Sequence, residues 1–207
     1  AELKSRSAPV MPTLRWQRDV TFSKDLPVKD GKATTSLALD LLHPADSISK
    51  PRPLVLFVHG GGWSRGNRSM GEDFLPLFAG GGAVAGTLSY RLAGEAPYPA
   101  ALQDVAAAVA WIRANADPLG VDPNRIAIWG HSAGAHLAIH TAVFDPDRAQ
   151  GIRCAVGVAG PYDLLLEEDA SPFGEMMVRN FLRDPADPLG MAEGAEDAIR
   201  ARARDAS

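Results

Sequence analysis

The stretch Gly-His-Ser-Ala-Gly at residues 130–134 follows directly on the apolar run Arg-Ile-Ala-Ile-Trp at residues 125–129. A serine between two glycines at the end of a buried strand is typical of a nucleophile elbow, a sharp turn from strand to helix. Such a turn exposes the serine hydroxyl, and the glycines let strand and helix approach closely. Ser132 is therefore the candidate nucleophile, and the other motifs are interpreted around it.

A second glycine-rich motif, His-Gly-Gly-Gly-Trp at residues 59–63, follows the continuous apolar run at residues 53–58. Such a run is typical of a strand buried on both faces of a parallel sheet. The glycines leave backbone N–H groups free to bind a developing oxyanion at about 3 Å. Ligands of open α/β sheets bind at the carboxyl ends of the strands. We therefore expect residues 59–63 to lie beside Ser132.

The periodicity of apolar residues predicts the remaining elements. Strands are expected at residues 14–22, 36–42, 53–58, 83–90, 125–129 and 152–159, and helices at 70–78, 99–115, 133–143, 171–182 and 191–205. The first two strands alternate and form an antiparallel edge. From residue 53 on, strands and helices alternate, which indicates a doubly wound, mostly parallel sheet with right-handed crossovers. Residues 1–13 are interpreted as an N-terminal arm, 14–207 as one domain, and 163–190 as a lid or cap segment.

Composition supports one globular domain and excludes some partners. Of 207 residues, 46% are hydrophobic and 22% are charged, and the net charge is −4 without a long basic run, so no nucleic-acid partner is expected. No apolar stretch approaches the roughly 20 residues that span a bilayer, and residues 1–10 lack the apolar segment of a signal peptide. The single Cys154 is expected to be a buried, inert thiol. A start at Ala1 fits a processed chain or a natural start at Met11, so localisation stays open.

Four motifs together carry a resemblance to a known family. They are residues 59–63, Ser-Tyr-Arg at 89–91, Asp-Pro-Asn-Arg-Ile at 122–126, and residues 130–134 followed by His-Leu-Ala at 136–138. They resemble the α/β-hydrolase fold, and more narrowly the bacterial carboxylesterases related to hormone-sensitive lipase and to feruloyl-esterase-like proteins. The resemblance covers roughly residues 16–166. It implies a serine carboxylic-ester hydrolase that acts on small esters through an acyl-enzyme, without metal or cofactor.

The resemblance also implies the residues of the site. Ser132 would attack the ester carbonyl, and the N–H groups of Gly61, Gly62 and Ala133 would form the oxyanion hole. Trp63 follows the three glycines at residues 60–62, and His131 precedes the nucleophile. Both are expected to shape the substrate pocket.

The chain departs from the family pattern in one respect. In these hydrolases the nucleophile is followed by an acid and then a histidine, each after a later strand. Here no histidine follows His140, and no buried strand follows residues 152–159. The fold is therefore expected to lack its last two strands. The resemblance places the acid and the histidine beyond Ser207.

The histidines that the chain does contain are expected to have other roles. His136 and His140 lie on the helix that follows the nucleophile and are interpreted as hydrogen-bonded structural residues. His59 is expected to brace the glycine-rich loop that it begins. His43 is expected to lie on the surface. Asp163 follows a strand and is expected to brace a loop, with the role of triad acid as its alternative.

Two further functions stay open: a truncated, non-catalytic homologue that binds a small molecule or partner, and an amidase or peptidase of the same fold. The strand at residues 152–159 would leave an uncovered sheet edge, for which we expect association with another chain or a covering element such as residues 176–182.

Overall fold

A computed structural model describes residues 13–28, 31–45, 50–144, 147, 149–165, 171–183 and 194–207. The strands are β1 (Leu14–Val28), β2 (Ala33–Pro44), β3 (Arg52–Val58), β4 (Val84–Leu88), β5 (Val121–His131) and β6 (Ile152–Val158). The helices are η1 (Arg68–Gly71), α1 (Leu75–Gly80), α2 (Ala100–Ala114), α3 (Ala116–Leu119), α4 (Ala133–Val143), α6 (Pro172–Leu182) and α7 (Ala195–Ala206). The expected arm lies outside the described residues except for Thr13, and so does much of the expected lid segment.

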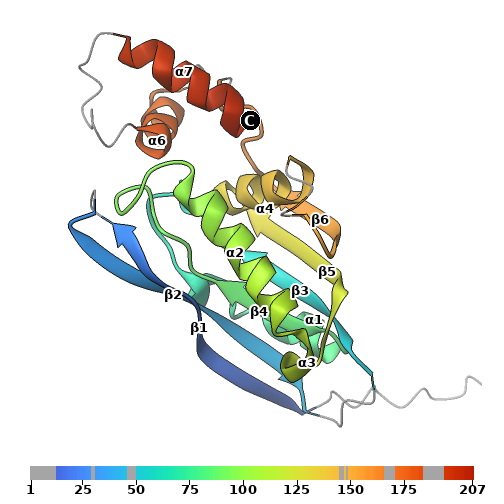
Figure 1. The fold of residues 1–207 in the computed structure, drawn as a ribbon. Coiled ribbons are helices and arrows are strands. Elements are labelled where there is room, and N and C mark those ends of the chain that lie inside the picture. Colours follow the sequence, from blue (N-terminus) through green and yellow to red (C-terminus); the bar gives the residue numbers. More distant parts are fainter. Residues whose placement is uncertain are drawn as a thin grey trace, which may run out of the picture.

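The strands form a six-stranded sheet in the order β1-β2-β4-β3-β5-β6 (Figure 1). β1 and β2 pair antiparallel, as do β2 and β4, whereas β4, β3, β5 and β6 run parallel. The prediction of a mostly parallel, doubly wound sheet with an antiparallel edge is confirmed. The parallel strands bring the carboxyl ends of β3 and β5 to the same edge of the sheet.

Two of the differences between the expected and the observed elements have a clear local cause. β1 continues to Val28 because a bulge accommodates extra residues: Asp19 has φ 56° and its N–H donates to Asp40 Oδ1 at 2.7 Å. The helix expected at residues 70–78 is divided into η1 and α1. Pro76 stands in the first turn of α1, where proline is favoured because its missing N–H is not needed.

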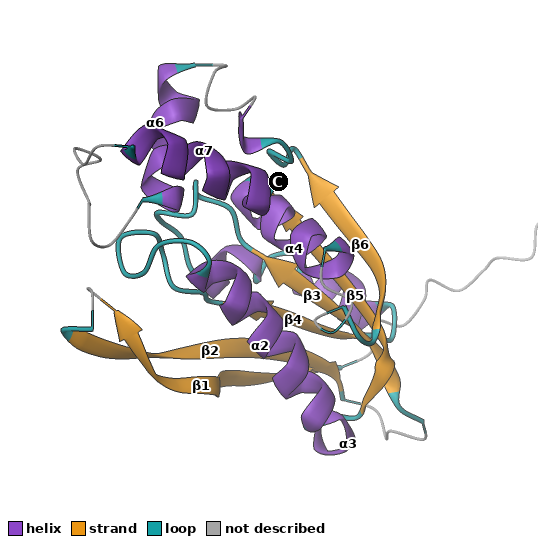
Figure 2. Ribbon diagram, turned by 45° about the horizontal axis from the view of Figure 1, so that its top comes forward, coloured by secondary structure: helices purple, strands orange, loops and turns teal. Residues whose placement is uncertain are grey.

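Helices cover both faces of the sheet. The smaller core cluster lies on the face of α1, and the larger one lies on the face of α2 and α4 (Figure 1). The adjacent residues Leu41 and Leu42 of β2 belong to different clusters because successive side chains of a strand point to opposite faces. α6 and α7 lie beyond the sheet, next to α4 (Figure 2). No helix within the described ranges combines the length and apolar character that crossing a membrane requires.

A buried ion pair joins α2 to the loop after β4. The guanidinium of Arg91 donates to Asp104 with an Nη2–Oδ1 distance of 2.7 Å, and the Arg91 N–H donates to Asp104 Oδ2 at 2.9 Å. Arg91 is 6% exposed and Asp104 is 2% exposed. The guanidinium of Arg91 also donates to Pro27 O at 3.3 Å, but Asp104 is its one partner of opposite charge among the described residues.

Replacing Asp104 by alanine is expected to lower the free energy of unfolding by about 3 kcal/mol, because the buried guanidinium loses its partner. Glu175→Ala is the matched control, since it breaks the exposed Arg179–Glu175 pair of α6 and is expected to cost less than about 0.5 kcal/mol. Urea unfolding of both variants measures the difference. Equal losses would contradict the assignment of a structural ion pair.

Two expectations about burial are wrong. Cys154 is exposed because it lies on β6, the last strand of the described sheet. His43 is 3% exposed because it lies on β2 between β1 and β4, with its Nε2 3.1 Å from Gln17 Oε1. Burial lowers the pKa of His43 to about 4.

β6 forms one edge of the described sheet, and β1 forms the other. Among the described residues β6 pairs with β5 alone, and Val156 and Val158 are 47% and 45% exposed. The expected partner or covering element at this edge stays a prediction.

Candidate active site

The nucleophile elbow lies between β5 and α4. Ser132 has φ 55° and ψ −124°, a positive-φ conformation that is unusual for serine and marks stored backbone strain. Its N–H donates to Val158 O at 2.9 Å, and its carbonyl accepts from the N–H of Ala135 at 2.9 Å. Within the described structure the Ser132 hydroxyl has no hydrogen-bond partner. The backbone of Ser132 is therefore fixed by hydrogen bonds, whereas its hydroxyl makes none to the described residues.

Two glycines make the elbow possible. A Cβ atom on Gly134 would overlap the carbonyl oxygens of Val58 and His59, and one on Gly130 would overlap the carbonyl of Gly134. Only glycine allows α4 to approach the end of β3 this closely. The close approach brings the first turn of α4 against the loop that follows β3.

The glycine-rich loop at residues 60–64, which we call the oxyanion loop, meets the elbow. Val58 and Gly130 are paired at the ends of β3 and β5. A Cβ built on Gly60 would lie 3.3 Å from Cβ of Ser132 and 2.7 Å from the carbonyl oxygen of His131. The two motifs, about 70 residues apart in the sequence, therefore form one site.

Some backbone N–H groups of the two motifs are left without an acceptor among the described residues. Within the described residues, those of Gly61 and Gly62 have no acceptor. Ala133 is the first residue of α4, where an N–H has no partner within the helix. The N–H groups of Ser64 and Arg65 both donate to Gly61 O at 3.2 Å, which closes the oxyanion loop into a turn.

His59 braces the start of the oxyanion loop. Its ring is fully buried, with Nδ1 2.8 Å from Gly60 O, and it stacks on Tyr90 at a centroid distance of 4.2 Å. The Tyr90 hydroxyl donates to His59 O at 2.9 Å. Burial lowers the pKa of His59 and raises that of Tyr90, so both rings are uncharged at neutral pH.

His136 has both ring nitrogens occupied. Trp63 Nε1 donates to His136 Nδ1 at 3.3 Å, so the ring proton is on Nε2, which donates to Ala206 O at 2.6 Å. Burial, the largest influence, lowers the pKa of His136 to about 4. The ring is thus a neutral structural group whose hydrogen bonds lead away from Ser132.

Acid is expected to destabilise the fold through His136. In the unfolded chain histidine has a pKa of about 6.5, so that chain binds a proton first as the pH falls. The free energy of unfolding is therefore unaffected by this group above about pH 6.5. It falls by up to about 3 kcal/mol as the pH is lowered toward 4. Urea unfolding near neutral pH and near pH 4.5 measures the loss, which should be smaller in His136→Gln. An equal loss in both proteins would contradict this explanation.

The remaining candidates lie around the site in different ways. His131 is exposed, with its ring facing Gly60. Trp63 is 1% exposed because Phe181 stacks on it at 4.5 Å. His140 is next to α7, with Nε2 3.4 Å from the carbonyl of Asp205.

Neither a base nor an acid for Ser132 is found within the described residues. All five histidines of the sequence are described, and none is hydrogen-bonded to the Ser132 hydroxyl. Asp163 Oδ1 accepts from Leu165 N–H at 3.1 Å, as a residue that braces its own loop would. In the described part of the chain, no three His, Cys, Asp or Glu side chains gather as ligands of a metal would.

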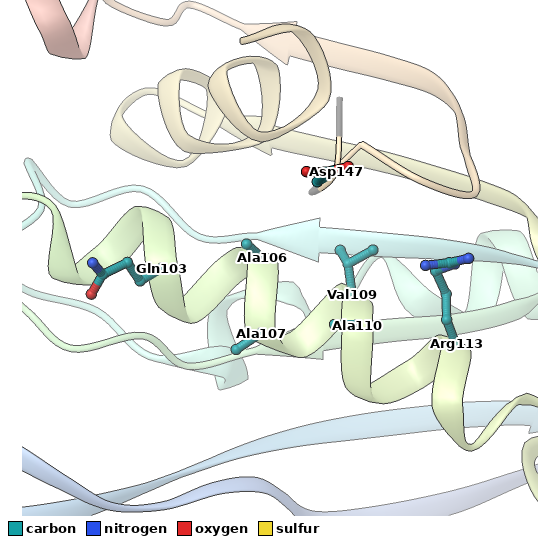
Figure 3. Close-up of a pocket in the computed structure, with 7 residues that line it drawn as sticks. All are labelled: Gln103, Ala106, Ala107, Val109, Ala110, Arg113 and Asp147. Carbon is teal, nitrogen blue, oxygen red and sulfur yellow. The ribbon is translucent and has the colours of Figure 1, made fainter. Parts of the chain in front are cut away.

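Two hollows lie away from Ser132. A groove of about 320 Å³ runs along α2 and faces Asp147 (Figure 3). It is lined by Gln103, Ala106, Ala107, Val109, Ala110, Arg113 and Asp147. A second hollow, between α4 and the end of α7, is lined by His136, Ile139, His140, Val143, Phe144, Tyr162 and Ser207. Neither includes Ser132 or the oxyanion loop.

Comparison with known proteins shows the family of the chain. Residues 39–175, more than half of the chain, match the family described as BD-FAE. The chain belongs to the BD-FAE family. Among curated relatives, this BD-FAE chain is 34% identical over 169 residues to Esterase LipC of Mycobacterium tuberculosis, covering 76% of this chain and 41% of that protein. It is 44% identical over 87 residues to Carboxylesterase NlhH of the same organism, covering 42% of this chain and 27% of that protein.

Solved structures show the same fold. An esterase of Pyrobaculum calidifontis matches with a TM-score of 0.68 and 26% identity, covering 86% of this chain and 62% of that one. The BD-FAE chain thus has the α/β-hydrolase fold of the esterases to which it is similar. It spans less than half the length of LipC and less than two thirds of the Pyrobaculum esterase.

Proposed function

We propose that this chain supplies the nucleophile and the oxyanion hole of a serine carboxylic-ester hydrolase. The observation that supports the proposal is the close approach of Gly60 to Ser132, which joins the glycine-rich loop, with its unbonded N–H groups, to the residue whose hydroxyl is free. Ser132 Oγ attacks the ester carbonyl, and the N–H groups of Gly61, Gly62 and Ala133 bind the oxyanion. The alcohol leaves, and water hydrolyses the acyl-enzyme.

The general base comes from a further segment. The chain covers 41% of LipC, and the described residues hold no base at Ser132. The Ser132 N–H is bonded to Val158 at the end of β6, whose outer edge has no strand partner among the described residues. A segment that pairs with this edge would extend the sheet beside the nucleophile. We propose that such a segment carries the histidine and the acid.

The substrate is a small ester. His131 is exposed beside Ser132, and we propose that it forms a wall of the pocket. Trp63 is buried under Phe181, so we propose that its ring supports the oxyanion loop and does not itself line the pocket. An amide substrate and a purely binding role are the competing proposals.

Kinetics with an extended chain test the proposal. The C-terminal segment of a related esterase, with its acid and histidine, is appended after Ser207, and hydrolysis of p-nitrophenyl butyrate and of the matching p-nitroanilide is followed. The extended chain is expected to cleave the ester at least about 100-fold faster than the 207-residue chain does. Faster cleavage of the anilide would favour an amidase. A folded extended chain without turnover would favour a binding protein.

A further inference from the structure

Helix α6 lies directly on the oxyanion loop. A Cβ on Gly62 would come within 2.5 Å of Met177 Cε, so this side chain packs against the backbone of Gly62. The rings of Phe181 and Trp63 are stacked at 4.5 Å with an interplanar angle of 16°. α6 therefore contacts two consecutive residues of the oxyanion loop.

A chain of hydrogen bonds joins α6 to the backbone of this loop. Asn180 Nδ2 donates to Ser64 Oγ at 2.7 Å, and Ser64 Oγ donates to Gly62 O at 2.9 Å. The carbonyl of Gly62 and the N–H of the next residue share one rigid peptide plane. Asn180 thus restrains the orientation of a peptide plane next to the N–H groups of the site.

A second chain of hydrogen bonds joins α7 to the same loop. Trp63 Nε1 donates to His136 Nδ1 at 3.3 Å, and His136 Nε2 donates to Ala206 O at 2.6 Å. Ala206 is the last residue of α7, where backbone carbonyls have no partner within the helix. His136 is buried on α4, between α7 and the oxyanion loop.

We propose that Asn180 and His136 are positioning residues, through which α6 and α7 hold the oxyanion loop in the conformation that presents its N–H groups to the substrate. The inference rests on the proposed esterase function. Donors stabilise a transition state most when they are already aligned, and a displacement of about 1 Å can cost about 100-fold in rate. The helices would then act on catalysis without touching the substrate.

Amide hydrogen exchange of the 207-residue chain tests the restraint without requiring catalysis. The informative amides are those of Ser64 and Arg65, bonded to Gly61 O, and that of Ala93, bonded to Trp63 O at 2.8 Å. The variants are Asn180→Ala and Trp63→Phe, the latter keeping an aromatic ring against Phe181 while removing the indole donor.

Each variant is expected to accelerate exchange of these amides by about 10-fold or more, while amides of β3 and β5 keep their protection. Glu175→Ala, an exposed change on α6, is expected to leave all of them unchanged. The proposal would be overturned if the amides of Ser64, Arg65 and Ala93 exchanged at the same rate in both variants as in the unmodified chain. Far-UV circular dichroism verifies that each variant is folded.

Kinetics of the extended chain give the second measurement. Asn180→Ala and Asn180→Asp, which cannot donate to Ser64, are each expected to lower kcat about 10-fold with KM within about 2-fold. If kcat and KM of the Asn180 variants changed no more than those of the Glu175→Ala control, a role of Asn180 in positioning would be contradicted. If the extended chain hydrolyses no ester, the proposed function fails, and the exchange measurement still decides whether the helices restrain the oxyanion loop.

Discussion

Replacing Ser132 by alanine is expected to reduce kcat of the extended chain by a factor of about 10⁴ or more. The oxygen of this hydroxyl bonds to the acyl carbon in the acyl-enzyme. Without it, the N–H groups of the oxyanion hole can assist only the slower direct attack by water. Alanine has a Cβ atom like serine, so the backbone strain at φ 55° stays about the same in the variant. The turn at residue 132 is therefore expected to be retained. Initial rates on p-nitrophenyl butyrate measure the loss.

Ser36→Ala is the matched control for this prediction. Ser36 is an exposed serine of β2, in the antiparallel part of the sheet, and its replacement is expected to leave kcat within about 2-fold. A Ser132→Ala protein that retained the rate of the control would show that another group attacks the ester.

Replacing Gly134 by alanine is expected to lower the free energy of unfolding by about 4 kcal/mol or more. The added methyl group would overlap the backbone oxygens of Val58 and His59, which cannot rotate away as a flexible side chain can. α4 would have to move off the end of β3, which would open the core between them. The shift in urea midpoint, with the slope held fixed, measures the loss.

Gly94→Ala provides the control, since a Cβ there would meet no heavy atom within 4 Å. This variant is expected to unfold within about 0.5 kcal/mol of the unmodified chain. If Gly134→Ala were as stable as Gly94→Ala, the close approach of α4 to β3 would be wrong.

The centre of the fold could be predicted because its signals are local. The elbow at residues 130–134 and the glycine loop at 59–63 each follow a continuous apolar run, and parallel pairing of these strands puts their ends together. The family resemblance is confirmed, and two of the four motifs that carry it follow these strands. The bulge at Asp19 was not predictable, because it depends on a hydrogen bond to Asp40 on another strand.

The surroundings of the site could be predicted only in part. The sequence indicates a structural role for His136, but its partners Trp63 and Ala206 lie 73 and 70 residues away in the sequence. Contacts of this range have no local signature. The burial of His43 and the exposure of Cys154 were missed because they depend on the order of strands in the sheet, where β2 is internal and β6 is at the edge.

The most direct test of the central claim locates the residue that becomes covalently modified. The extended chain is treated with a p-nitrophenyl alkyl phosphonate, whose phosphorus bonds to a nucleophilic serine as nitrophenolate leaves, and the proteolytic peptides are analysed by mass spectrometry. The account predicts one adduct, on the peptide that contains Ser132, and its loss in Ser132→Ala. An adduct on any other residue, or one that persists in Ser132→Ala, would contradict the account.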